Sequence, residues 1–178
     1  MKIKKYPPLK EKTDAKLRYA QLYLDALKEP KIEGSDLEKA HQESFLFHLN
    51  GVVDAFLAEI NELFGLGLKG KHLTIDHLKS AKPESKKSLK EVKKLGKLLG
   101  KKNWLAELKS FDPNNVKPAK KGKKSEVDME ISNLVEQVGI IPTNPKLEMF
   151  ENWQAKMRGL ISELRESALQ GSGNAPKK

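Results

Sequence analysis

Apolar residues recur at helical spacing along much of the chain, most densely between residues 35 and 64. Phe45, Leu49, Val52, Phe56 and Ile60 follow one another at steps of three and four residues, the period of an α-helix. The apolar residues that fall between them are Leu46, Phe47, Val53, Leu57 and Leu63. A helix that is apolar nearly all round is a buried one. We therefore predict that residues 35–64 form the central helix of the fold.

Capping and breaking residues indicate the bounds of this helix and of the one before it. Ser35 and Glu38 have the capping-box spacing that starts a helix, and Gly65 and Gly67 indicate its end. We expect the preceding helix to begin at Thr13 or Asp14, which are good N-caps, and to stop at Pro30. Its inward stripe is Leu17, Ala20, Leu24 and Leu27, widened by Tyr19 and Tyr23. The short connection predicts that the two helices are antiparallel neighbours.

The rest of the chain predicts further helices and no strand. We expect a short helix around residues 73–78, a lysine-rich helix over about 84–99, and a brief helix capped by Asn103. Another helix follows over 125–138, then an extended strap at 140–142. The last helix starts at Asn144-Pro145, with proline at its first position, and runs to about Ala168. The fold class is therefore all-α, a helical bundle of about five main helices around residues 35–64.

Composition predicts one helical domain over residues 13–170, with less ordered segments around it. Residues 1–12 are expected to form a flexible arm, and residues 171–178 a disordered tail. Residues 112–124 contain two prolines, five lysines and one branched apolar residue. Such a composition does not offset the entropy of ordering, so we predict a flexible linker there.

The composition also limits the class of protein. The chain has no cysteine, so it has no disulfide framework and no thiol chemistry. Its first residues carry charge without the apolar run of a secretory signal. A membrane-spanning helix needs about 20 largely uncharged residues, whereas residues 35–64 are interrupted by polar groups. These are Glu43, His48, Asp54, Glu59 and Glu62. We expect a soluble cytoplasmic protein without membrane insertion, and its oligomeric state stays open.

Positive charge is concentrated in one segment. Residues 69–124 hold 18 lysines, no arginine and 5 acidic residues. Lysines attract phosphates as point charges, and this segment adds only Trp104 and Phe111 for base stacking. It is therefore either the solvated face of the bundle or a weak polyanion-binding site. The candidate binding residues are Lys86, Lys87, Lys90, Lys93, Lys94, Lys97, Lys101, Lys102, Lys120, Lys121, Lys123 and Lys124.

Few residues form a recognisable catalytic pattern. Glu38 and His41 have the Glu-x-x-His spacing of di-iron bundles, but such a site needs two of these motifs. We expect His41 at a helix–helix seam and His48 buried and hydrogen-bonded. Three roles stay open for Asp54: it caps a loop, it pairs with Arg18 or Lys16 of the first helix, or it lies on a polar edge with Asn50 and Asn61. We expect no metal, no cofactor and no enzymatic activity.

Three runs carry a resemblance to a known family: AHQESFLFHLNGVVDAF, NWLAELKSF and LEMFENWQAKMRGLISELRES. They resemble a family of small, uncharacterised bacterial helical proteins, classed as a domain of unknown function. The resemblance covers about residues 13–170 and departs from the family in the lysine-rich residues 82–124. It implies an all-α fold and no known activity.

A looser similarity is to the helical HEPN nucleases. Their active site has an arginine followed four to six residues later by a histidine. Here Arg18 is followed first by His41, and neither Arg158 nor Arg165 precedes any histidine. RNase activity is therefore not implied. We expect a protein-interaction or adaptor module that binds another protein, with accessory nucleic-acid binding as the alternative and an enzyme third.

Overall fold

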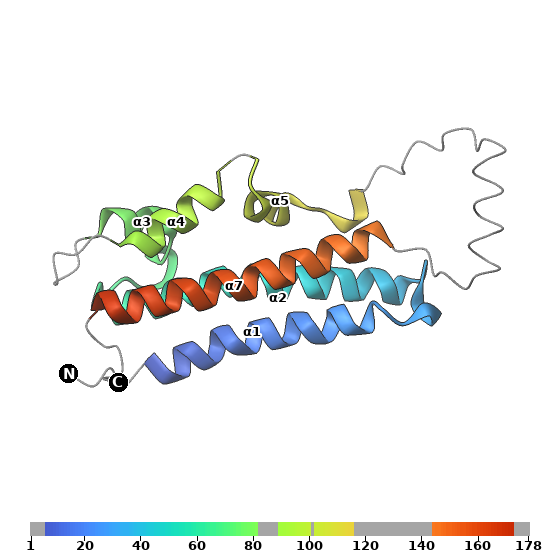
Figure 1. Ribbon diagram of the computed structural model, residues 1–178, viewed down its shortest axis with the longest axis horizontal. Coiled ribbons are helices and arrows are strands. Elements are labelled where there is room, and N and C mark those ends of the chain that lie inside the picture. Colours follow the sequence, from blue (N-terminus) through green and yellow to red (C-terminus); the bar gives the residue numbers. More distant parts are fainter. Residues whose placement is uncertain (1–5, 82–88, 101, 116–143, 173–178) are drawn as a thin grey trace.

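The computed structural model describes residues 6–81, 89–100, 102–115 and 144–172, which form six α-helices and no strand (Figure 1). The all-α prediction is confirmed. Three long helices lie side by side: α1 (Tyr6–Ala26), α2 (Asp36–Leu63) and α7 (Pro145–Ser172). The shorter α3 (Ile75–Ser80), α4 (Lys90–Leu98) and α5 (Trp104–Ser110) lie on one side of them, away from α1. Short 3-10 turns occupy Pro30–Ile32, Gly70–His72 and Pro113–Asn115.

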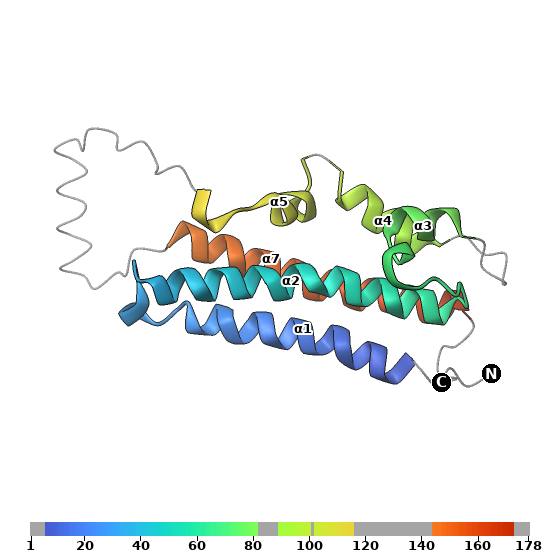
Figure 2. The same ribbon diagram turned by 180° about the vertical axis from the view of Figure 1, so that it is seen from behind.

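Helix α2 is the centre of the core, as predicted. Phe45, Leu49, Val52, Phe56 and Ile60 are all fully buried. Helix α1 packs along one side of α2, and α7 and α5 contact other sides (Figure 2). Burying these large side chains between several helices removes apolar area from water, which is the main favourable contribution to the stability of the bundle.

The start of α2 follows the predicted capping pattern. The Ser35 hydroxyl accepts a hydrogen bond from the Glu38 backbone N–H at 3.2 Å. The Glu38 carboxylate in turn accepts from the Gly34 N–H at 2.6 Å. The first bond satisfies a backbone donor that the first turn of a helix leaves free, and the second ties Glu38 to the residue before the N-cap. At the other end, Gly65 has a φ of 63°, which a glycine adopts without strain.

Helix α1 begins earlier than predicted. Its first residue is Tyr6, so the expected flexible arm is wrong for residues 6–12. Thr13 is buried inside the helix, and its hydroxyl donates to the Leu9 carbonyl instead of capping a first turn. Pro7 and Pro8 fall within the first turn, where the missing N–H groups remove no helical hydrogen bond. They therefore start the helix and do not exclude it.

The lysine-rich helix and its neighbours differ from the prediction in their bounds. Helix α4 starts at Lys90 and not near residue 84. The Asn103 side chain donates to the carbonyls of Lys97 and Gly100, so it closes the end of α4 and does not cap α5. Asn114, inside the predicted linker, donates to the Glu43 carboxylate of α2 at 2.7 Å. The first residues of that linker are therefore held against the bundle.

Helix α7 starts where the sequence predicts and ends later. The Asn144 side chain accepts hydrogen bonds from the N–H groups of Lys146 and Leu147, and Pro145 is the first helical residue. Both Leu160 and Ile161 are buried. The helix continues through Gly171 and Ser172, two residues assigned to the tail. The predicted helix at 125–138, the strap at 140–142 and the rest of the linker lie outside the described residues.

Candidate interaction surface

Large apolar side chains are exposed on one side of the helix pair α1 and α2. Within the described ranges the exposed ones are Tyr19 (46%), Leu22 (65%), Leu37 (52%) and Phe47 (67%). We name the group Tyr19, Leu22, Tyr23, Phe47 and His48 the aromatic surface. Scattered single apolar residues are normal at a protein surface, but a contiguous group is typical of an interaction site.

The rings of this surface are held against one another. His48 stacks on Tyr23 with ring centroids 5.6 Å apart and an interplanar angle of 11°. It meets Tyr19 and Phe47 edge-on, each at 5.2 Å. The Lys16 ammonium lies 4.5 Å from the centre of the Phe47 ring, a cation–π contact. These contacts restrict the side chains before any partner arrives, and this lowers the entropy lost on binding.

Burial and charge also act on His48. Its position among the rings lowers the pKa of the imidazole, and the Lys16 ammonium lowers that pKa further. The Lys16 Nζ and His48 Nδ1 atoms are 3.5 Å apart. Both effects favour the neutral imidazole. The aromatic surface is therefore less charged than its residue types suggest.

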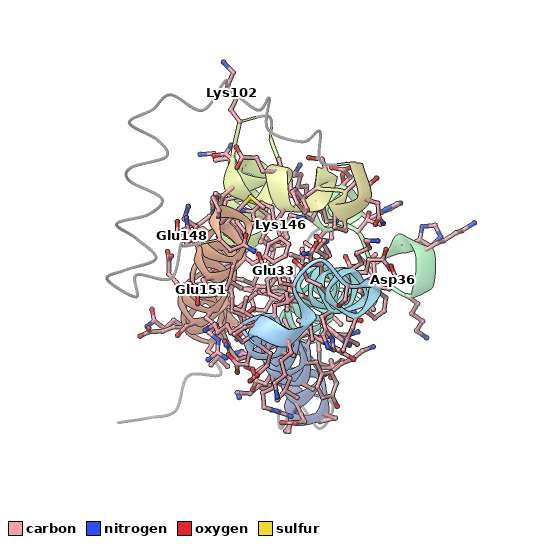
Figure 3. All side chains as sticks on the ribbon, turned by 90° about the vertical axis from the view of Figure 1, so that its right-hand side faces the viewer. Glu33, Asp36, Lys102, Lys146, Glu148 and Glu151 are labelled. Atoms are coloured by element: carbon pink, nitrogen blue, oxygen red, sulfur yellow. The ribbon has the colours of Figure 1, made fainter. Side chains whose placement is uncertain are left out.

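Helical spacing explains how the aromatic surface forms. Tyr19 and Tyr23 are four residues apart on α1 and lie on one side of it. On α2, Leu37, His41, Ser44 and His48 follow at steps of four and three along the edge next to α1. A hollow of about 280 Å³ opens between the helices, lined by Tyr19, Leu22, Tyr23 and His48. Figure 3 looks along the bundle and shows no other described helix on the far side of α1.

A buried ionic cluster joins the three long helices near the amino end of α1. Arg165 of α7 donates to both oxygens of Glu59 of α2, at 3.0 and 2.9 Å, and to Asp14 of α1 at 2.9 Å. The Glu59 side chain is fully buried. Burial and the negative charge of Glu59 raise the pKa of Tyr6 to about 12. The cluster fits a structural role, because its charges are paired across the three helices.

The predicted polyanion-binding lysines are partly described. Lys90, Lys93 and Lys97 are exposed on α4, and Lys102 projects from the bundle on the side opposite α1 (Figure 3). Lys94 is paired with Glu163 of α7 at 2.6 Å, so its charge is partly neutralised. The other members of the set lie outside the described residues: Lys86, Lys87, Lys101, Lys120, Lys121, Lys123 and Lys124.

The other candidate residues have ordinary surroundings. Glu38 of the Glu-x-x-His motif serves the helix cap and accepts from Gln42, while the His41 ring leans on Tyr23 at 5.6 Å. Asp54 is exposed and meets neither expected partner, since Arg18 pairs with Glu11 and Lys16 lies over Phe47. In the part of the chain that the structure describes, no three His, Asp or Glu side chains are placed to hold a metal ion. Nor is any described helix both long and apolar enough to cross a bilayer.

The aromatic surface was not predicted from the sequence. Apolar spacing alone predicts that Tyr19 and Tyr23 widen the buried stripe of the first helix and that Phe47 lies on a helix buried nearly all round. Both assignments are wrong in part, because α1 covers only one side of α2 and leaves its outer edge open. The available signal was the pairing of two tyrosines four residues apart with two histidines seven residues apart on the neighbouring helix.

Comparison with known proteins gives a family and no activity. No curated protein and no solved structure matches the chain. The model of one family, described as a family of unknown function (DUF6586), matches residues 8–170. This range includes all of α2, all but the ends of α1 and α7, and the whole aromatic surface. The chain therefore belongs to the family of unknown function DUF6586.

Proposed function

We propose that this protein works by binding another protein through the aromatic surface of α1 and α2, without catalysing a reaction. The observation that carries the proposal is the grouping of Tyr19, Leu22 and Phe47, which are each 46–67% exposed and lie around the ordered ring of His48. Aromatic side chains dominate the energetics of protein interfaces, because they bury a large area while fixing few rotatable bonds.

The chemistry of this surface also favours a protein partner over a small molecule. The hollow beside Leu22 is open to solvent, whereas small-molecule sites enclose most of the ligand. Lys16 contacts the Phe47 ring of the surface, and the exposed Asp25 and Glu29 follow Leu22 along the chain. An apolar centre with a charged rim is the usual composition of a protein–protein interface.

Affinity capture with matched variants tests the proposal. The bait is the whole chain, compared with Leu22→Glu and Phe47→Glu, which place a charge on the aromatic surface at exposed positions. Ala155→Glu, at an exposed position of α7, adds the same charge elsewhere. We expect the unaltered chain and Ala155→Glu to capture the same protein in equal amounts. Leu22→Glu and Phe47→Glu should fail to capture it. The captured protein is then purified and titrated against the same four chains.

Two results would contradict the proposal. One is a partner that all four chains bind equally, since the interface would then lie elsewhere. The other is the absence of any captured protein, including further copies of the chain itself. Unfolding curves for each variant are the control, because a variant that has lost its fold would also lose its partners.

Polyanion binding is a second candidate function. It is favoured by Lys90, Lys93 and Lys97, which are three and four residues apart and project from one exposed side of α4. The segment lacks arginine, so it has no fork of donors to read a guanine edge. Binding through it would be weak and insensitive to sequence. We rank it below protein binding, because a lysine-covered helix face is also the ordinary way to keep a bundle solvated.

A further inference from the structure

We propose that the occupant of the aromatic surface is a second copy of this chain, whose α1 packs antiparallel against α1 about a two-fold axis. This proposal rests on the proposed function, since it names the partner of the same surface. The basis is a second stripe of residues on α1, separate from the buried stripe. When a second copy of α1 lies antiparallel to the first, the residues of the two stripes match one another in size and in charge.

The second stripe faces away from the core. The buried residues of α1 are Thr13, Ala20 and Leu24. On the outer side, a different set follows at alternating steps of three and four residues: Lys12, Ala15, Tyr19, Leu22, Ala26 and, in the turn after the helix, Glu29. Such a spacing is the seam of a two-helix coiled coil. Tyr19 and Leu22, at its centre, are about half and two-thirds exposed, so in one copy the seam has no partner.

In the antiparallel arrangement, each large or small residue of the stripe lies opposite a residue of the same size class in the second copy. A two-fold axis that passes between residues 20 and 21 places Tyr19 opposite Leu22 of the second copy, and Ala15 opposite Ala26. The large pairs then form the centre of the interface, and the small pairs flank them on both sides. An interface with two-fold symmetry contains each such pair twice.

The antiparallel arrangement also places charged residues of the stripe opposite residues of the other sign. Lys12 comes opposite Glu29 of the second copy, and on the neighbouring row Arg18 comes alongside Asp25. Parallel helices would instead place Lys12 against Lys12 and Glu29 against Glu29, and like charges at an interface disfavour that arrangement. Charge therefore selects the antiparallel pairing.

The surroundings of the stripe can accommodate a second helix. The hollow lined by Tyr19, Leu22, Tyr23 and His48 lies directly beside it and can receive Leu22 of the second copy. Helix α1 is an edge helix, and its far side is uncovered (Figure 3). The exposed lysines of α4 lie on the other side of the bundle, so two chains with a net charge of +10 can meet at α1 with these lysines far apart.

Sedimentation equilibrium over a range of concentrations tests for the second copy. We expect a monomer–dimer equilibrium for the unaltered chain and for Ala155→Glu. Leu22→Glu should raise the dissociation constant about 100-fold, since each of the two buried leucines is replaced and each contributes roughly a factor of ten. Circular dichroism of both variants checks that the helices remain.

Charge reversal tests the antiparallel register. Lys12→Glu and Glu29→Lys should each weaken the dimer about tenfold, because both Lys12–Glu29 pairs of the dimer become repulsive. An equimolar mixture of the two variants should dimerise as well as the unaltered chain, since both opposing pairs are complementary again. In a parallel dimer the single variants would bind no more weakly than the unaltered chain, whose opposing residues already have like charges, and the mixture would bind more tightly than the unaltered chain.

Disulfide trapping gives an independent reading of the register, because the chain contains no cysteine. Oxidation of Ala15→Cys mixed with Ala26→Cys should give a covalent dimer, whereas neither variant should cross-link alone. Cross-linking of Ala15→Cys to itself would overturn the antiparallel arrangement. An unaltered chain that stays monomeric up to high micromolar concentration would overturn the second copy. If the chain were monomeric but captured another protein that Leu22→Glu did not bind, the proposed function would stand without the second copy. If the monomeric chain captured no protein, the proposed function and the second copy would both be wrong.

Discussion

Phe56 and Asp54 are two residues apart on α2 and have opposite surroundings. Phe56 is fully buried at the centre of the core, and Asp54 is exposed. We expect Phe56→Ala to lower the free energy of unfolding by about 3–5 kcal/mol, the cost of a cavity at a buried phenylalanine. Asp54→Ala is the matched control and should change it by less than about 0.5 kcal/mol. Urea unfolding measures both. Equal effects would mean that α2 is rotated from the described position.

His48 provides a pH-dependent contribution to stability. Lys16, Tyr19 and Tyr23 face it from α1, and Phe47 lies beside it on α2; its folded pKa is lowered by burial and by Lys16. The unfolded chain therefore takes up the proton more readily than the folded one. Stability must fall as the pH drops through the unfolded value, roughly 6.5, and the loss stops below the lowered folded pKa.

The measurement is the free energy of unfolding at about pH 7.5 and about pH 5.5, on either side of the ordinary histidine pKa. We expect the unaltered chain to lose stability over this interval and His48→Gln to lose less, because the substituted side chain does not titrate. An equal loss in the two chains would show that His48 contributes nothing to the pH dependence.

At the scale of elements, the ion pair between Arg165 and Glu59 fixes how α7 meets α2 and α1. Removing one partner leaves the other charge buried and unpaired. We expect Arg165→Met to lower the free energy of unfolding by about 3–5 kcal/mol, and the double variant Arg165→Met with Glu59→Leu to lower it by much less. Urea unfolding of both variants measures this. A double variant as unstable as Arg165→Met would mean that the cost arises from packing and not from the unpaired carboxylate.

The sequence predicted the helices better than the contacts and exposure of their side chains. Apolar spacing and local caps were sufficient for α2 and for the start of α7, because Ser35, Glu38, Asn144 and Pro145 act on their own helix termini. Capping residues gave wrong helix starts where contacts with the rest of the fold determine what the side chain binds. Thr13 is a good cap by type but is buried in α1, and Asn103 turns back to the carbonyls of α4. The aromatic surface depends on which edge of α2 stays uncovered, and spacing on one helix does not contain that information.

At the scale of the whole molecule, the exposed lysines of α4 predict a weak, salt-sensitive affinity for nucleic acid. We expect micromolar binding to duplex DNA at low salt that is lost near physiological ionic strength. Replacing Lys90, Lys93 and Lys97 by Gln should reduce the log–log salt slope by up to about 0.9 for each phosphate contact removed. Replacing Lys31, Lys39 and Lys156, which are exposed on other sides, gives the same change of charge as a control.

Fluorescence anisotropy with labelled duplexes of two unrelated sequences measures this affinity. The two sequences should bind equally, because lysine provides no bidentate contact to a base edge. Tight binding that survives physiological salt and disappears with the three α4 substitutions would place nucleic acid ahead of protein binding.

The central claim is that the outer side of α1 and α2 contacts protein. Photo-crosslinking in living cells tests it most directly, with a benzophenone amino acid at position 22 on the aromatic surface or at position 155 on α7. We predict a discrete protein adduct from position 22, either with a second copy or with another protein, and none from position 155. No adduct from position 22, or the same adducts from both positions, would contradict the claim.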